Sequence, residues 1–204
     1  FMCHSGIEDF PRADDATLHA GMAICARLGR IVAVHAENDA LTSRRLGPTA
    51  RDFMASRPLI AELEAIGRAI AFAEDTGCAL HIVHVSSGRG VALVTDARRR
   101  GVDVTCETCP HYLFLTPADA ERLGPVAKCA PPVREHPGLW ERLDEIDLVA
   151  SDHSPSSPER KQGAFADAWG GIAGCQTTLA LLAGACAPET LARLTSGGAA
   201  DRFR

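Results

Sequence analysis

Residues that can bind a metal ion or move a proton follow several apolar stretches of this chain. His35 follows "IVAV", His84 follows "HIV" and Asp152 follows "LVAS", while Glu107 and His111 lie near the end of a fourth stretch. Two neutral imidazoles and a carboxylate suit a borderline divalent ion such as Zn²⁺, Mn²⁺ or Fe²⁺. Glu37, His81 and His153 lie in the same segments. The pattern predicts a metal site formed by two such imidazoles and a carboxylate, if the fold brings these segment ends together.

Each of these residues also has a plainer interpretation. A single histidine at the end of a strand is usually a hydrogen-bonded structural residue, and Asp152 can simply cap the next helix. The repetition at three stretches favours the metal site. His81 precedes His84 by three residues, so the two side chains should face opposite sides of one strand. We expect His19, on a helical face, and His136, in a Pro-rich loop, to be solvated.

Short apolar stretches alternate with segments of helical periodicity, and these elements must position the site. The stretch at 57–77 has apolar residues at helical spacing, Pro58 in its first turn and Gly77 at its end, which predicts a helix. The predicted strands are 30–38, 79–87, 102–113 and 146–155, and the other predicted helices are 90–101, 136–145, 174–187 and 188–203.

Alternating strands and helices with nearly continuous apolar strands indicate an α/β fold with a parallel sheet covered by helices. No linker divides the chain, so we expect one domain. An open doubly wound sheet and a (β/α)₈ barrel are both compatible with this pattern. A doubly wound nucleotide-binding fold usually has a glycine-rich phosphate loop, and "SSGRG" lacks its spacing. In a barrel, all strands would open their carboxyl ends on one face.

Composition limits the class of protein. The chain has 204 residues, of which 46% are hydrophobic and 23% charged, with a net charge of −5. This acidic balance predicts no nucleic-acid or membrane partner. The eight cysteines lie mostly in apolar stretches, so we expect buried, reduced thiols in a cytoplasmic protein. "CETC" is a lone CxxC pair, which disfavours a zinc or redox role for it.

Six motifs, in order, resemble those of a known family. "VHAEN", "HVSS", "TCETCPHYL", "AKCAPPVRE", "SDHSP" and "FADAWGGIAGCQ" are similar to the second half of a cyclic amidohydrolase, a family of dihydroorotases, hydantoinases (dihydropyrimidinases) and allantoinases. "SRPLIAELEAI" and "AWGGIAG" are most similar to allantoinases. The resemblance implies a metal-dependent (β/α)₈ TIM barrel, with 1–204 running from the end of the fourth strand through the eighth strand and its following helices. The N-terminal half of the barrel is then expected outside this sequence.

The resemblance also assigns roles to single residues. His35 and His84 match ligands of the second metal ion, and Asp152 matches a ligand of the first ion and the general base. Four residues match positions that contact the substrate: His4, Ala130, Ser154 and Gly170. Arg57 is expected to fix the start of a helix, whereas His111 belongs to a motif without an assigned chemistry.

Members of the family hold two divalent ions, here expected to be Zn²⁺, with Mn²⁺, Co²⁺ or Fe²⁺ as alternatives. A carboxylated lysine bridges the ions in the family, and a His-x-His pair binds the first. Neither motif is present in this sequence, since Lys128 and Lys161 lie in other motifs. The bridging lysine is expected two residues before Phe1.

The implied activity is the hydrolysis of a cyclic amide, with allantoin opened to allantoate in purine degradation. The alternatives are a hydantoinase (dihydropyrimidinase), a dihydroorotase, or a non-catalytic barrel used for assembly. We expect a small-molecule cyclic amide as substrate, no nucleic-acid or membrane partner, and a homo-oligomer, either a dimer or a tetramer.

Overall fold

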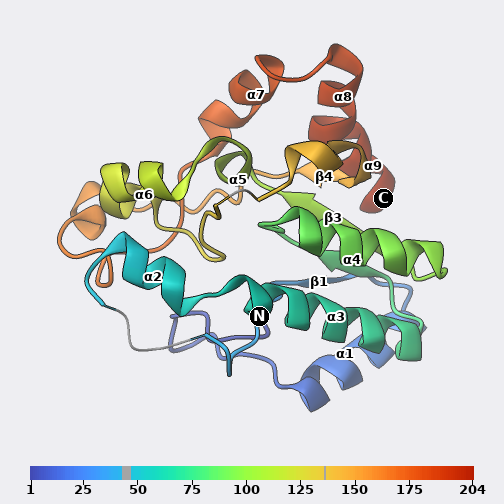
Figure 1. The fold of residues 1–204 in the computed structure, drawn as a ribbon. Coiled ribbons are helices and arrows are strands. Elements are labelled where there is room, and N and C mark those ends of the chain that lie inside the picture. The colour runs from blue at the N-terminus through green and yellow to red at the C-terminus, as the bar shows by residue number, and fades with distance from the viewer. Residues whose placement is uncertain (43–46, 136) are drawn as a thin grey trace.

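A parallel sheet of four strands forms the centre of the chain (Figure 1). The computed structural model describes residues 1–42, 47–135 and 137–204. The strands pair in chain order, β1 with β2, β2 with β3 and β3 with β4, and every pair is parallel. They are β1 (Val32–Val34), β2 (Leu80–Ile82), β3 (Val104–Thr108) and β4 (Leu148–Val149). The predicted parallel α/β architecture is therefore confirmed.

The register brings the carboxyl ends of the strands to one edge of the sheet. Val34 lies opposite Ile82 on β2, which in turn lies opposite Cys106 on β3. Thr108, the last residue of β3, lies opposite Val149, the last residue of β4. Each strand is shorter than predicted, because the polar residues after it leave the hydrogen-bonded ladder and turn into loops. Those loops carry the predicted site residues.

Helices precede, connect and follow the strands. The α-helices are α1 (Asp15–Arg27), α2 (Ala50–Ser56), α3 (Leu59–Thr76), α4 (Gly88–Arg99), α5 (Pro110–Phe114), α6 (Pro117–Leu123), α7 (Cys175–Ala183), α8 (Pro188–Ala192) and α9 (Gly198–Arg202). Short 3₁₀ or π turns are η1 (Gly124–Ala127), η2 (Trp140–Glu145), η3 (Pro158–Lys161) and η4 (Arg193–Gly197).

Several predicted bounds need correction. The predicted strand 102–113 ends at Thr108, because Pro110 cannot donate to a strand ladder and instead begins α5. The predicted helix 136–145 is the 3₁₀ turn η2, and His136 lies outside the described residues. The single predicted helix 188–203 is a succession of α8, η4 and α9. The helices α1, α2 and α6 were not predicted as elements, although His19 of α1 was expected on a helical face.

Helix α3 ends at Gly77 as its sequence predicts, but it begins at Leu59, two residues later than predicted. Pro58 is its N-cap residue, and Gly77 ends it in the left-handed conformation with φ of 69°, its N–H donating to the carbonyl of Ala73. The buried face includes Ile66 and Ile70. Alanines fill most other positions on this face, so α3 can approach the sheet closely.

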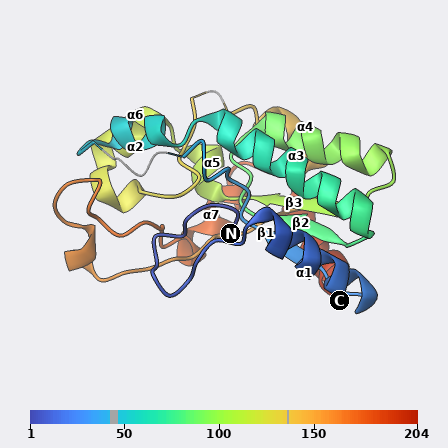
Figure 2. The same ribbon diagram turned by 90° about the horizontal axis from the view of Figure 1, so that it is seen from below.

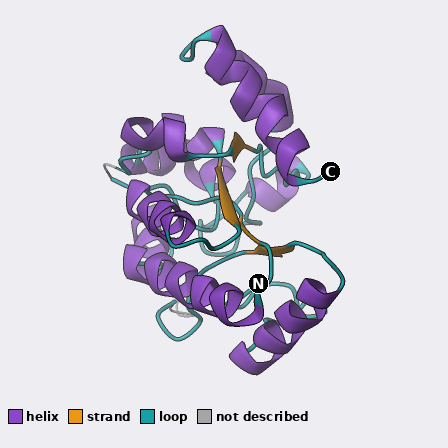
Figure 3. Cartoon of the chain, turned by 90° about the vertical axis from the view of Figure 1, so that its right-hand side faces the viewer, coloured by secondary structure: helices purple, strands orange, loops and turns teal. Residues whose placement is uncertain are grey.

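Helices α3 and α4 lie side by side along one face of the sheet (Figure 2). Gly90 of α4 allows this close packing, because a Cβ atom there would lie 2.7 Å from Val85 Cγ1 and 3.0 Å from Ile66 Cδ1. Figure 3 shows the strands at the centre, bordered by helices. The core between them contains Leu80, Ile82 and Val91, all fully buried.

The cysteines are all free thiols. Cys3, Cys78, Cys106, Cys109 and Cys129 are buried, as predicted, whereas Cys175 is exposed at the start of α7, where the prediction is wrong. Across residues 1–42, 47–135 and 137–204, no helix combines the length and the apolar character needed to cross a membrane.

Candidate metal and substrate site

Two imidazoles meet directly beyond the ends of β1 and β2. His35 Nδ1 lies 2.8 Å from His84 Nε2, and the two residues are 5% and 6% exposed. Burial lowers the pKa of both rings, and that of His84 falls to about 4 because the neighbouring His35 adds to the effect. Both rings are therefore neutral near pH 7, and the neutral form is the one that binds metal ions.

Asp152 reaches the same edge of the sheet from beyond the end of β4. Its charge acts on His84 and partly offsets the lowering of that pKa. Its carboxylate also lies within 4.8 Å of ligand atoms offered by Cys109 and His111, which follow β3. The structure thus brings the three predicted ligands to one edge, and it adds Cys109 and His111 beside Asp152.

The backbone at two of these positions is unusual. His84 has φ of 41° and Asp152 has φ of 44°, and among the described residues they alone combine a positive φ with a side chain other than that of glycine. Such conformations cost on the order of 1–3 kcal/mol and tend to mark functional sites, where surrounding contacts maintain them. The strain coincides with two of the three predicted metal ligands.

Glu37 and Arg57 fix the orientation of His35, a role that sequence reasoning did not find. His35 Nε2 donates to Glu37 Oε2 over 2.9 Å, and Arg57 donates to the same fully buried oxygen. Burial alone would raise the pKa of this carboxyl, but the His35 hydrogen bond and the Arg57 charge outweigh it and hold the pKa at about 2. An ionised carboxylate only accepts hydrogen bonds, so Nε2 carries the proton and the lone pair of Nδ1 points to His84.

The expectation that Arg57 fixes a helix start is wrong. Its side chain turns to Glu37 instead, and α3 begins two residues later. One sequence signal could have found Glu37: it lies two residues after His35 in "VHAEN", a spacing that places both side chains on the same side of an extended segment.

His81 lies apart from this pair, as its spacing predicts. Its ring nitrogens lie 2.8 Å from Thr105 Oγ1 and 3.1 Å from Glu107 Oε2. Both nitrogens are occupied, so His81 and Glu107 support the sheet rather than a metal ion. His19 is partly exposed and lies 2.7 Å from Asp75, in agreement with a solvated position.

Three of the four predicted substrate contacts lie on adjoining segments. The N–H of Gly171 donates to the carbonyl of Lys128 over 2.7 Å, and the N–H of Ser154 donates to the carbonyl of Ile172 over 3.0 Å. Ala130, Ser154 and Gly170 are therefore carried by neighbouring backbone. His4 is held separately by Asp39, whose Oδ1 lies 3.0 Å from His4 Nδ1, although the preceding Cys3 lies 3.4 Å from His35 Nε2.

These residues fit a bound metal ion. His111, which lies beside Asp152, has a buried Nε2 atom with no hydrogen-bond partner among the described residues. Two imidazole nitrogens on one tetrahedral Zn²⁺ lie about 3.4 Å apart. The 2.8 Å between His35 and His84 would need to widen only slightly to match this value.

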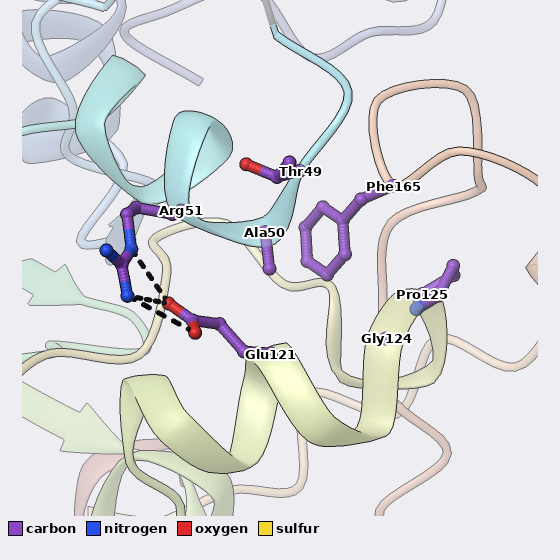
Figure 4. Close-up of a pocket in the computed structure, with 7 residues that line it drawn as sticks. All are labelled: Thr49, Ala50, Arg51, Glu121, Gly124, Pro125 and Phe165. Atoms are coloured by element: carbon purple, nitrogen blue, oxygen red, sulfur yellow. Dashed lines mark hydrogen bonds and ion pairs between the residues drawn. The ribbon is translucent and has the colours of Figure 1, made fainter.

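A hollow in the surface, shown in Figure 4, contains none of the predicted site residues. Its volume is about 440 Å³. It lies between α2 and α6, where the ion pair of Arg51 and Glu121 borders it on one side and Phe165 on the other. A second hollow, of about 430 Å³, includes His4 in its lining.

Comparison with known proteins gives close relatives of defined class. The chain is 54% identical to an allantoinase of Rubrobacter xylanophilus and 52% identical to an allantoinase of Solibacter usitatus; each match covers 100% of this chain and 49% of the relative. It is 51% identical to an allantoinase of Deinococcus radiodurans, over 88% of this chain and 43% of the relative. No protein-family model matches the sequence.

The fold matches solved hydantoinases. An L-hydantoinase (dihydropyrimidinase) from Arthrobacter aurescens superposes with a TM-score of 0.92 at 34% identity, over 99% of this chain and 49% of that one. A D-hydantoinase from Thermus sp. gives a TM-score of 0.86 at 26% identity, over 96% and 48%. These matches confirm the predicted fold class, the second half of a (β/α)₈ barrel.

The chain spans about half the length of the curated relatives that it matches. Sequence identity to the allantoinases named above exceeds that to the hydantoinases. In sequence and in fold, the chain therefore belongs with the cyclic amidohydrolases, and among the relatives named here it resembles the allantoinases most.

Proposed function

We propose that the complete protein hydrolyses a cyclic amide and that its substrate is allantoin, which opens to allantoate. Relatives named as allantoinases support the substrate. The observation that carries the chemistry is the contact between two buried, neutral imidazoles, His35 and His84, at the sheet edge that Asp152 also reaches.

We further propose that His35 and His84 hold one divalent ion and that Asp152 holds a second. Zn²⁺ is the first candidate, with Mn²⁺, Co²⁺ or Fe²⁺ as alternatives, since imidazole and carboxylate ligands accept all of them. A carboxylated lysine from outside this sequence would bridge the two ions. When bound, the ions would lower the pKa of water and polarise the amide carbonyl.

Asp152 is the proposed general base. Its side chain is exposed at the mouth of the site, so water can reach it. It accepts a proton from the attacking water and returns that proton to the ring nitrogen as the C–N bond breaks. Glu37 keeps the proton of His35 on Nε2, so the Nδ1 lone pair faces the site.

The proposed substrate contacts surround this base. Ser154 follows Asp152 by two residues, and the segments that carry Ala130 and Gly170 are hydrogen-bonded to its surroundings. Backbone N–H groups there, together with His4, would stabilise the tetrahedral oxyanion, with about 3 kcal/mol from one well-placed donor.

Replacement of Asp152 tests this assignment. In the complete protein, Asp152→Asn should retain the fold and the metal content of the His35 and His84 site, and it should lower kcat for allantoin by at least about 100-fold. Asn also tolerates the positive φ at this position, so any fall in melting temperature should come from weaker binding of the second ion and should disappear when the wild type and the variant are compared in chelator. Near wild-type turnover by this variant would refute the assigned base.

A hydantoinase is the second candidate, because the solved structures with this fold are hydantoinases. Parallel assays of the complete protein with allantoin, hydantoin, dihydrouracil and dihydroorotate separate the candidates. The highest kcat/KM should be found with allantoin. If another ring is preferred by tenfold or more, the substrate assignment is wrong.

The localisation, the oligomeric state and the partners of the complete protein are also matters of proposal. We propose a cytoplasmic homo-oligomer, a dimer or a tetramer, that binds no nucleic acid; the net charge of −5 on these 204 residues supports the last point. Light scattering on the purified protein measures the oligomeric state. A non-catalytic assembly protein would have a metal content near zero and no turnover of any of the four rings.

A further inference from the structure

The two lysines of this chain bind the same loop. The sequence has 21 basic residues of the Lys and Arg types, and Lys128 and Lys161 are its two lysines. Lys128 Nζ donates to the carbonyls of Ala166 and Ala168 over 2.8 and 2.7 Å. Lys161 Nζ donates to the carbonyl of Trp169 over 2.8 Å and also to that of Gly171. Four carbonyls of the segment 166–171 therefore face two ammonium groups.

Lys128 depends on these carbonyls for its charge. The residue is only 7% exposed, and its closest polar contacts are these carbonyls, although the charge of Asp167 also acts on it. Its Nζ lies 5.3 Å and 5.9 Å from the ring centroids of Phe53 and Phe165. Burying an ammonium ion is costly unless hydrogen bonds replace its water, and the loop carbonyls supply those bonds while the rings add a weaker attraction.

The far end of the loop packs against the strand end that carries the proposed base. Gly171 has φ of 112°, and a Cβ atom there would lie 2.4 Å from the Cβ and Oγ atoms of Ser154. Its N–H donates to the carbonyl of Lys128 over 2.7 Å, and the next residue, Ile172, accepts from the N–H of Ser154. The lysines thus hold the loop along 166–171, and the segment following Asp152 holds it at Gly171 and Ile172.

We propose that Lys128 and Lys161 are positioning residues, which hold the loop 164–171 against the end of β4 so that Gly170 and Ser154 can contact the substrate. Neither ammonium touches the reacting atoms in this arrangement. Lysine suits the role better than arginine, because its compact ammonium directs three donors at separate carbonyls, whereas a guanidinium needs a wider planar space. The substrate part of this inference rests on the proposed function.

Kinetics of the complete protein test the substrate part. Lys128→Met, Lys161→Met and the double variant are compared with Arg51→Met, a matched control that removes an exposed cation whose side chain is 79% accessible. Each lysine variant should raise KM for allantoin by about 10-fold, with kcat and metal content little changed, because binding contacts are lost rather than chemistry. The double variant should resemble the single variants, since both lysines act through one loop. The control should match the wild type.

Hydrogen exchange tests the loop directly and needs no activity. The N–H groups of Phe165, Trp169 and Gly171 are hydrogen-bonded to backbone carbonyls, so they should exchange slowly in the wild type. Peptides covering 164–171 should exchange at least about 10-fold faster in the lysine variants, and peptides of α3 should not change. Lys161 is less buried than Lys128, so Lys161→Met should disturb folding less. If Lys128→Met fails to fold, the kinetic and the exchange experiments are done with Lys161→Met alone.

Two results would overturn the inference. One is unchanged exchange in 164–171; the other is an unchanged KM combined with a loss of metal or a general loss of stability, as a merely structural role predicts. If the wild type hydrolyses none of the four cyclic amides, the proposed function fails instead, and the exchange experiment still decides whether the lysines hold the loop.

Discussion

The orientation of His35 depends on a buried ion pair that does not itself reach the metal site. Glu37 is completely buried, and its oxygen Oε2 accepts hydrogen bonds from both His35 and Arg57. A carboxylate in this position keeps the imidazole in one tautomer and one rotamer, which is how partners of metal-binding histidines tune the ligand. Arg57 in turn keeps the carboxylate ionised.

Removal of Arg57 should leave an uncompensated buried charge. We expect Arg57→Met to lower the free energy of unfolding by about 3 kcal/mol or more, because breaking a buried pair exposes the full desolvation cost of the remaining ion. Urea denaturation of the complete protein measures this value. Arg51→Met, which breaks the exposed pair with Glu121, should cost less than about 1 kcal/mol. Equal losses in the two variants would contradict the buried-charge argument.

The candidate ligand residues could be predicted from sequence, but, apart from Glu37, the residues that hold them could not. His35, His84 and Asp152 follow apolar stretches, so their placement follows from the parallel sheet alone. Arg57 lies 20 residues from Glu37 in sequence, and no periodicity links a loop residue to a partner across the fold. The lysines that bind the loop 164–171 are separated from it in the same way.

At the scale of elements, the site depends on strands that end together and on helices that pack tightly behind them. The sequence predicted all four strands and the helices α3 and α4 near their observed positions, because apolar periodicity is strong there. It missed α2 and α6, which are seven residues each and too short to show a clear period. It also extended the third strand into α5, where Pro110 marks the change.

The contact of α4 with α3 leaves no space for a methyl group at Gly90. Gly90→Ala should destabilise the protein by about 1–3 kcal/mol, because the new Cβ would lie 2.7 Å from Val85 Cγ1 and push α4 off the sheet. Gly67 lies within α3, and a methyl group added there would meet no atom within 4 Å, so Gly67→Ala should instead stabilise by up to about 1 kcal/mol. Thermal unfolding of both variants checks the sign of each effect.

A capping box starts α6. Thr116 accepts from the N–H of Asp119, and the Asp119 carboxylate accepts from the N–H and hydroxyl of Thr116. The hydrogen bond from the Thr116 side chain, with one from Arg122, lowers the pKa of Asp119 to about 2 from 3.8. A carboxyl whose pKa is lower in the folded state than in the unfolded state stabilises the folded state when the pH is above its unfolded-state pKa. This contribution is lost as the pH falls through the folded-state pKa.

Thr116→Ala should therefore have a pH-dependent effect. Above pH 4 the variant should be less stable by about 1 kcal/mol, the usual cost of a lost N-cap. The deficit should shrink as the pH falls from about 4 towards 2, because Asp119 then becomes protonated in the wild type as well. Denaturant midpoints of both proteins at pH 7, 5, 4 and 3 measure the difference. A deficit that stays constant down to pH 3 or grows would show that Asp119 is not the partner responsible.

At the scale of the whole molecule, the chain contributes one side of a site. It matches about half the length of its relatives, and it contains two imidazoles and one carboxylate of the ligand set that the family resemblance implies. The alternation of apolar strands and helical segments correctly indicated a parallel α/β fold, but it says nothing about which other segments pair with the outer edges of β1 and β4. The metal content therefore has to be measured on the complete protein.

Metal removal should lower the melting temperature of the complete protein, and the size of the effect should depend on His35 and His84. An ion that binds only the folded state stabilises it by about 2.7 kcal/mol when its free concentration is 100 times its Kd. Treatment with a chelator should therefore lower the melting temperature, and adding back Zn²⁺ should restore it. The chelator should lower the melting temperatures of His35→Asn and His84→Asn less than that of the wild type, because each variant lacks an imidazole that would hold one ion, while the ion proposed at Asp152 remains. Elemental analysis should find about two ions in the wild type and fewer in both variants; a wild type with none, and a melting temperature indifferent to chelator, would favour the non-catalytic assembly protein instead.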